Sequence, residues 1–589
     1  MQILQGIAVS PGLAIGEALV LDNEGFRIPR RFVNHDAADI ELDRWAKSLK
    51  AVADQIAENR DQIASELGDE YGAIFAAHLQ MLRDPKLNRE IQALIKDHQH
   101  SAEYAVSKTL KDYAKVFQSL DNRFLAERAN DLFDLEKRLL GDLLGQARQE
   151  LANQEDPAIV LAHNLTPSET ARLDPETILG FATEVGGQSD HTAIVAEALE
   201  IPAIVGIGGL LTSIVSGDRV IVDGDQGVLI HQPDEETYQR YQNRVRERAE
   251  LAQELIPLVE QPSETEDGER VKLSANIEFP EEVKSCCDRG ADGVGLYRTE
   301  FLFLGRDEDP SEEDHYRAYI AVAQALYPRP VVIRTLDLGA DKLGREESQQ
   351  SGERNPFLGV RSIRLSLRNL SLFRTQLRAV LRASALGNMR VMFPMITTLQ
   401  ELRQAKLVLH EVMEDLEEQG IPFDRDLQIG IMVEVPSAVM LLDRFLPEVS
   451  FVSIGTNDLT QYALAVDRGN KDVAELYRAS DPAVLRLIKM TIDSALARDV
   501  PVNLCGQMCG NPLFSMLLIG LGLRSMSVRP SALLEIKQIV RHLNVTDCEE
   551  VAENVMAMEG PREIERYLSE ELRRRVPEAI ARRHHWVQD

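Results

Sequence analysis

Strand-like and helical segments alternate along the second half of the chain, and this alternation limits the possible folds more than any other feature. Eight apolar segments have strand character: Val271–Ile277, Asp292–Glu300, Pro330–Gly339, Met389–Met395, Ile429–Pro436, Phe451–Leu459, Pro501–Met508 and Ser525–Pro530. Eight strands with intervening helices over about 300 residues are typical of a (β/α)8 barrel of the TIM type. An open doubly wound sheet is the competing arrangement.

The first half of the chain combines an α/β pattern with a helical block. The segment after Gly6 predicts one or two short strands broken by Pro11-Gly12, and strand-like segments return after Asp156. Between them, apolar residues recur at three-to-four spacing, as in Ala73–Asp84 and Phe124–Leu144. The pattern therefore predicts a helical subdomain inserted into an α/β domain.

The changes of pattern also predict where the domains meet. Asp234–Glu260 has the spacing of a polar amphipathic helix, and the turn-rich acidic stretch Gln261–Arg270 follows it. We therefore place the main boundary there. The predicted division is an α/β domain over residues 1–35 and 146–233, a helical subdomain over 36–145, a linker helix over 234–260 and the barrel over 261–589.

Composition narrows the class of function. The chain has 589 residues and a formal net charge of −30, which argues against general nucleic-acid binding because that needs a basic face. Five cysteines are too few and odd in number for a disulfide framework, and favour a reducing compartment. Neither a signal peptide nor an apolar run of membrane-spanning length is evident, so we expect a cytoplasmic protein without membrane insertion.

Acidic and amide side chains gather where two of the predicted barrel strands end. Glu434 ends one apolar strand, and the next ends at Asn457-Asp458. Barrel active sites lie at the C-terminal ends of the strands, so these side chains are expected to meet. Two carboxylates at adjacent strand ends suit Mg²⁺, which prefers one or two protein carboxylates together with substrate oxygens.

Arginines on the neighbouring segments extend this group. Arg298 and Arg334 lie in apolar strands, Arg361 follows the second of them, and Arg468 lies just beyond Asp458. Guanidinium groups bind phosphate and carboxylate in bidentate geometry. The sequence therefore predicts a small substrate that carries both groups, such as phosphoenolpyruvate. A structural ion pair remains the alternative for any single arginine.

Two further residues, Cys505 and His191, each have two possible roles. Cys505 ends the seventh strand, where it is either a small buried hydrophobic residue or a general acid or base beside an enolate. His191 opens a predicted helix after a Gly-Gly turn. Helix N-terminal amides favour an anion there, and an imidazole can carry a phosphoryl group. A structural histidine is the alternative.

Long motifs over nearly the whole chain resemble Enzyme I of the bacterial phosphotransferase system. They are GVGLYRTEFLF, IRTLDLGADK, NPFLGVRSIR, VEVPSA and IGTNDLTQY in the barrel, and LTPSETA and HTAIVAEALEIPAIVG before it. The resemblance implies a swivelling phosphohistidine α/β domain with an inserted helical subdomain, followed by a (β/α)8 barrel through which the chain forms a homodimer. It also implies that an HPr-like phosphocarrier protein docks on the helical subdomain and receives the phosphoryl group.

The resemblance further implies a role for each candidate residue. His191 would take the phosphoryl group of phosphoenolpyruvate, and Cys505 would protonate the enolate of pyruvate. Glu434 and Asp458 would bind Mg²⁺. The substrate would be held by Arg298, Arg334, Arg361, Asn457, Asp458 and Arg468.

The His191 loop departs from the family pattern. Gln188 and Asp190 stand where the family has a basic residue and a small hydroxyl, and Glu197 stands where it has arginine. The added negative charge predicts slower loading of His191. A regulatory relative that binds phosphoenolpyruvate but transfers weakly is therefore the alternative function. A phosphoenolpyruvate synthase or pyruvate phosphate dikinase would need a further nucleotide-binding domain, for which this chain has no room.

Overall fold

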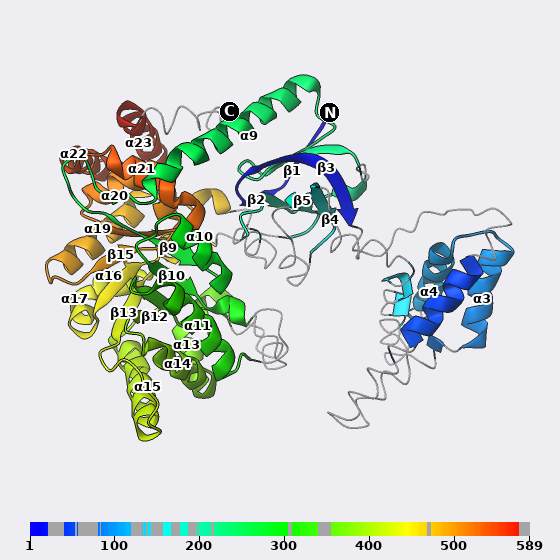
Figure 1. Ribbon diagram of the computed structural model, residues 1–589, viewed down its shortest axis with the longest axis horizontal. Coiled ribbons are helices and arrows are strands. Elements are labelled where there is room, and N and C mark those ends of the chain that lie inside the picture. Colours follow the sequence, from blue (N-terminus) through cyan, green and yellow to red (C-terminus); the bar gives the residue numbers. More distant parts are fainter. Residues whose placement is uncertain are drawn as a thin grey trace.

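The computed structural model contains a mixed β-sheet, a helical bundle and a β/α barrel, each a separate body in Figure 1. The described residues are 1–21, 41–53, 84–118, 157–165, 177–186, 199–212, 217–303, 309–339, 355–467 and 473–576, with stretches of one to three residues between some of these ranges. Within this part of the chain, every helix is too short or too polar to cross a membrane.

The second half of the chain forms a closed barrel of eight parallel strands. The strands are β9 (Lys272–Ile277), β10 (Val294–Arg298), β11 (Val331–Arg334), β12 (Met389–Phe393), β13 (Gln428–Val433), β14 (Phe451–Ile454), β15 (Val502–Leu504) and β16 (Ser525–Val528). Each predicted segment overlaps one of them, and only β13 begins outside its segment, one residue earlier. Because β16 pairs in parallel with β9, the sheet is closed, which confirms the barrel and excludes the open doubly wound sheet.

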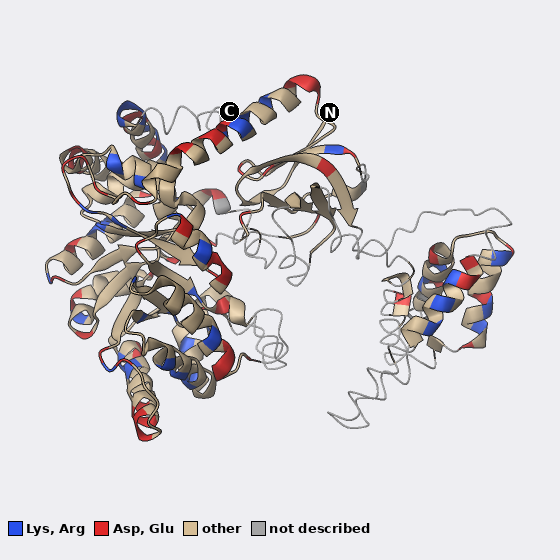
Figure 2. Cartoon of the chain, in the orientation of Figure 1, with Lys and Arg blue, Asp and Glu red and all other residues tan. Residues whose placement is uncertain are grey.

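Helices surround the barrel and bury its outer face. They are α10 (Val283–Asp288), α11 (Glu312–Leu326), α13 (Ser362–Arg368), α14 (Leu370–Ser384), α15 (Leu399–Glu418), α16 (Pro436–Met440), α17 (Leu442–Phe445), α18 (Thr456–Leu464), α19 (Pro482–Leu496), α20 (Ser515–Gly520), α21 (Leu533–Arg541), α22 (Val545–Met556) and α23 (Pro561–Arg575). Capping boxes at Ser311 and Thr398 satisfy the first amides of α11 and α15. Figure 2 shows charged residues mainly along the helices, while apolar side chains between helices and strands form the core.

The first half of the chain contains an eight-stranded mixed sheet. Its strands are β1 (Gln2–Gln5), β2 (Ile7–Ser10), β3 (Leu13–Leu21), β4 (Ala158–Ala162), β5 (Ile178–Thr183), β6 (Ala203–Val205), β7 (Arg219–Asp223) and β8 (Val228–His231), in the order β1-β8-β7-β3-β4-β5-β6-β2. β3 pairs in parallel with β4, although the helical bundle lies between them in the sequence. The bundle is therefore inserted between two neighbouring strands of one sheet, as the sequence predicts.

The inserted bundle has a hydrophobic core of its own. Residues 41–53 are helical, and α3 (Pro85–Lys96) and α4 (Ala102–Gln118) follow. The Asp84 side chain caps α3 by accepting hydrogen bonds from the Lys86 and Leu87 amides. Trp45, Ile91 and Val106 are among the buried core residues. Most of the two predicted helices Ala73–Asp84 and Phe124–Leu144 lies outside the described residues.

One long helix, α9 (Glu235–Leu255), connects the sheet to the barrel (Figure 1). Tyr241 Oη and Arg244 Nη1 both donate hydrogen bonds of 3.0 Å to Asp223 Oδ2 at the end of β7. Just beyond the helix, Lys537 Nζ of α21 donates to the carbonyl oxygens of Leu258 and Val259. The helix is thus fixed to the sheet in its first half and to the barrel just after its end.

Candidate active site at the barrel mouth

The candidate residues of the barrel meet at the C-terminal ends of its strands. Arg298 and Arg334 end β10 and β11, and Glu434 directly follows β13. Asp458 lies in the first turn of α18, and Cys505 directly follows β15. Parallel strands in a closed barrel all end at the same rim, so residues far apart in the sequence become neighbours there.

Two of the arginines are held by a network of buried carboxylates. Arg334 Nη2 lies 2.7 Å from Glu300 Oε1, and Arg334 Nη1 lies 2.9 Å from Asp337 Oδ2. Asp337 Oδ1 lies 3.2 Å from Arg361 Nη2, so this one carboxylate bridges both guanidinium groups. Burial alone would raise the pKa of Asp337, but Arg334 and Arg361 outweigh it and lower the pKa. The network fixes both cations in place before any ligand binds.

Both guanidinium groups keep unused donors. The Nε atoms of Arg334 and Arg361 are buried and have no hydrogen-bond partner among the described residues. Arg361 Nη1 makes a weak contact of 3.4 Å with Tyr462 Oη. Buried donors without a partner are costly, and an anionic ligand would satisfy them.

Glu434 and Asp458 form a buried acidic pair. Glu434 Oε1 accepts a 2.6 Å hydrogen bond from the Met395 amide. Burial raises the pKa of Glu434 well above its usual range, and the charges of Asp458 and Asp337 raise it further. Asp458 Oδ1 is buried and has no partner in the described part of the chain. Two repelling carboxylates with an unsatisfied oxygen fit a hard divalent cation.

The metal-binding potential of the barrel mouth rests on these two carboxylates. The described residues contain no group of three or more His, Cys, Asp or Glu side chains suited to hold a metal ion. A cation here would therefore take its remaining ligands from substrate and water, as is usual for Mg²⁺.

Cys505 is buried at the base of the mouth. Its Sγ lies 3.6 Å from the Ile454 carbonyl oxygen, and its own carbonyl oxygen accepts a 3.0 Å hydrogen bond from Asn276 Nδ2. Burial raises the pKa of the Cys505 thiol, so the sulfur keeps its proton at neutral pH.

The segment after Cys505 packs tightly against the end of β14. Asn457 Oδ1 accepts a 3.0 Å hydrogen bond from the Gln507 amide. A Cβ atom on Gly506 would lie 1.8 Å from Thr456 Oγ1, so only glycine allows this approach. These contacts fix Cys505 and Asn457 relative to each other.

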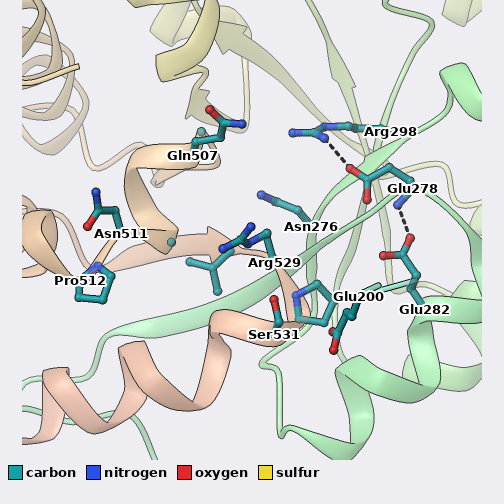
Figure 3. A pocket seen from close by; sticks show the side chains of 14 residues that line it. Glu200, Asn276, Glu278, Glu282, Arg298, Gln507, Asn511, Pro512, Arg529 and Ser531 are labelled. Carbon is teal, nitrogen blue, oxygen red and sulfur yellow. Dashed lines mark hydrogen bonds and ion pairs between the residues drawn. The ribbon is translucent and has the colours of Figure 1, made fainter. Parts of the chain in front are cut away.

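A cavity of about 320 Å³ opens beside this group of residues (Figure 3). Arg298 lines it and forms an ion pair with Glu278, which directly follows β9. Gln507, Asn511 and Arg529 line other sides of the cavity. Glu278 was not predicted as a site residue, although it carries the same signal as the residues that were: it is a charged residue directly after an apolar strand.

The sheet domain contacts the barrel beside this cavity. Glu200 lines the cavity, and its carboxylate lies 2.6 and 2.8 Å from the two terminal nitrogens of Arg289, at the end of α10. His191 and Arg468 lie outside the described residues, as do Gln188, Asp190 and Glu197, the residues near His191 that depart from the family pattern. Their positions relative to the mouth therefore stay predictions.

Three family models match successive parts of the chain. The N-terminal part of PEP-utilising enzymes matches residues 5–128, their mobile domain matches 154–227, and their PEP-binding domain matches 252–545. The last of these covers the barrel strands and the mouth, and the mobile-domain match includes the segment that carries His191.

Curated relatives match over almost the whole chain. A phosphoenolpyruvate-protein phosphotransferase of Priestia megaterium is 40% identical over 95% of this chain and 97% of its own length. The protein of the same name from Bacillus subtilis is 39% identical over 97% of this chain and 100% of its own length. That of Haemophilus influenzae is 38% identical over 97% of this chain and 99% of its own length. The chain therefore belongs to the phosphoenolpyruvate-protein phosphotransferase family, the Enzyme I family.

Proposed function

We propose that this protein takes the phosphoryl group of phosphoenolpyruvate onto His191, releases pyruvate, and passes the group to a histidine of an HPr-like carrier protein. The arrangement of the barrel mouth gives the strongest support: fixed arginines lie near two buried carboxylates and a protonated buried thiol. Membership of the phosphoenolpyruvate-protein phosphotransferase family names the substrate and the class of acceptor.

Phosphoenolpyruvate would bind to the arginines through its phosphate and carboxylate groups. Arg334 and Arg361 are already held by Glu300 and Asp337, so little reorganisation is needed when the substrate binds. Arg298, Asn457 and Arg468 complete the proposed substrate contacts.

Glu434 and Asp458 would hold Mg²⁺. A bound Mg²⁺ neutralises charge on the transferring phosphoryl group and orients it. The cation would also relieve the repulsion between the two carboxylates, which now raises the pKa of Glu434 in addition to burial.

His191 would attack phosphorus, and the bond between phosphorus and the bridging oxygen would break. The electron pair of that bond leaves with the oxygen and gives the enolate of pyruvate. The Cys505 thiol then donates its proton to the methylene carbon, which gives pyruvate and a thiolate. Burial has raised the pKa of this thiol, so the thiolate readily takes a proton from water and the site is restored.

We further propose how the parts of the chain divide this work. The α/β domain (1–35 and 146–233) would carry His191 between the barrel (261–589) and a carrier docked on the helical subdomain (36–145), with 234–260 as the linker. Two chains would associate through their barrels. The cytoplasm, where phosphoenolpyruvate is available, is the proposed location.

Transfer to a carrier separates this function from the regulatory alternative. The protein is incubated with labelled phosphoenolpyruvate, Mg²⁺ and an HPr-like carrier, and the label on each protein is followed after rapid separation. We expect label on the carrier in amounts far above the amount of enzyme. Label that stays on this chain, with none on the carrier, would favour a regulatory relative that binds phosphoenolpyruvate and transfers weakly.

Replacement of Cys505 with alanine is expected to slow pyruvate formation by about 10²–10⁴-fold, the usual contribution of a positioned proton donor. Substrate affinity should change much less, because the arginines are untouched. Pyruvate release is measured in a coupled assay and phosphoenolpyruvate affinity by calorimetry. Equal losses of affinity and turnover together with a lowered melting temperature would instead make Cys505 a buried packing residue.

A further inference from the structure

Arg298 differs from Arg334 and Arg361, the other two described arginines of the proposed substrate site. Its side chain is 27% exposed, whereas those of Arg334 and Arg361 are 10% and 11% exposed and are tied to buried carboxylates. Arg298 reaches the cavity from the end of β10 and pairs there with Glu278 (Figure 3). Of these three arginines, Arg298 is therefore best placed to exchange one anionic partner for another.

The backbone at Glu278 is held in place by a turn. The amides of Glu278 and Phe279 both donate 2.7 Å hydrogen bonds to Glu282 Oε2. The Phe279 ring packs against that of Phe301 with 5.1 Å between the ring centroids. Burial raises the pKa of Glu282, and the Glu278 charge raises it further. Glu278 is the carboxylate of this turn that pairs with Arg298.

We propose that Glu278 is an internal counter-ion that competes with the substrate for Arg298. In the free site Glu278 neutralises this guanidinium, and a bound anion must take it over. The inference rests on the proposed function, because it treats Arg298 as a substrate ligand. Glu278 is then a residue that sets affinity, without taking part in a chemical step.

The competition has a direction that follows from charge. Phosphoenolpyruvate brings a phosphate and a carboxylate, whereas pyruvate brings a carboxylate alone. After the phosphoryl group has left, the bound molecule carries less negative charge and attracts Arg298 less strongly. The ion pair between Arg298 and Glu278 can then form again, which favours release of pyruvate. Interactions that only tighten substrate binding lower KM without raising kcat, so weaker ground-state binding does not by itself slow the reaction.

The test measures phosphoenolpyruvate binding without turnover. The full-length His191→Ala protein is titrated with phosphoenolpyruvate in the presence of Mg²⁺ by calorimetry, with and without Glu278→Gln. Glutamine keeps the size of the side chain, and the turn is fixed by backbone amides and Glu282, so the variant should fold. A carboxylate some 6 Å from a bound anion predicts binding on the order of tenfold tighter in the variant.

Two further variants separate the possible explanations. Glu448 pairs with Arg403, and Glu448→Gln removes the same charge from that ion pair. Glu448 lies just before the start of β14 and hence toward the other end of the barrel. This variant should leave the affinity unchanged. Arg298→Ala should weaken binding, because a substrate ligand is lost. The melting temperature of each variant is measured alongside.

The outcomes distinguish a failure of this inference from a failure of the proposed function. Tighter binding in Glu278→Gln alone supports the counter-ion. The counter-ion role would be overturned if Glu278→Gln bound phosphoenolpyruvate no more tightly while Arg298→Ala bound it more weakly. An equal gain of affinity in Glu448→Gln would also overturn it. A purely structural role for Glu278 would give weaker binding and a lower melting temperature, the opposite sign. Unchanged binding in Arg298→Ala would show that the proposed substrate site itself is wrong.

Discussion

Replacement of His191 with alanine is expected to abolish phosphorylation of the protein by phosphoenolpyruvate. In the proposed mechanism this imidazole is the nucleophile, and alanine offers no atom that can carry the phosphoryl group. The measurement is acid-labile, alkali-stable label retained on the protein after incubation with labelled phosphoenolpyruvate and Mg²⁺. Phosphoenolpyruvate binding should persist, since the barrel mouth is unchanged.

A second histidine of the same domain provides the control. His163 follows β4 and pairs with Glu184, with 2.7 Å between Nδ1 and Oε2. The His163→Ala protein should be labelled as fully as the unmodified protein, because the His163 imidazole is held by a carboxylate and has no proposed part in the transfer. If His191→Ala were labelled as fully as the unmodified protein, the phosphoryl group would have to reside elsewhere.

The double variant Glu434→Ala with Asp458→Ala should slow phosphoryl transfer by about 1000-fold or more. A metal ion that neutralises the transferring phosphoryl group contributes several kcal/mol, and about 4 kcal/mol corresponds to three decades in rate. Burial and the charge of Asp458 both raise the pKa of Glu434 and make its ionised form costly, so the fold should tolerate the removal of both acids. The readout is the rate of labelling over a range of Mg²⁺ concentrations.

A matched pair of acids on the barrel surface shows whether the loss is specific. Glu411 and Asp415 of α15 both pair with Arg374. Replacing these two with alanine removes the same charge and should leave the Mg²⁺ dependence unaltered. If the Glu434 and Asp458 double variant kept the Mg²⁺ dependence of the unmodified protein, the metal ligands would have to be other residues.

The barrel and the gathering of its polar residues could be predicted from the sequence. Its strands are apolar and short, and helices of regular spacing separate them, so the alternation is visible without tertiary information. Once the strands are parallel and closed, any residue just after a strand must lie at one rim. That is why Glu434 and Asp458 could be expected together although 24 positions separate them.

The pairing within the mouth could not be predicted in the same way. Asp337 bridges Arg334 and Arg361, yet nothing in the spacing distinguishes it from a solvent-exposed acid at the end of a strand. The same holds for Glu278 and Arg298, which pair because they lie one position beyond Ile277 and Tyr297, two residues that are opposite each other in the neighbouring strands β9 and β10. Strand order in the mixed sheet was also hidden, because β1, β2, β7 and β8 join at its edges by antiparallel pairing that leaves little trace in the pattern.

In the proposed mechanism, the phosphoryl group passes from phosphoenolpyruvate to His191 as pyruvate is formed. A single-turnover experiment tests it most directly: enzyme in excess is mixed with labelled phosphoenolpyruvate and Mg²⁺, without carrier and without nucleotide, and quenched at successive times. Pyruvate and protein-bound label are counted, and the labelled peptide is identified by mass spectrometry. We predict one pyruvate for each phosphoryl group on the protein, with the label on His191. Pyruvate formed without protein-bound label, or label on any other residue, would show that His191 is not the phosphoryl acceptor.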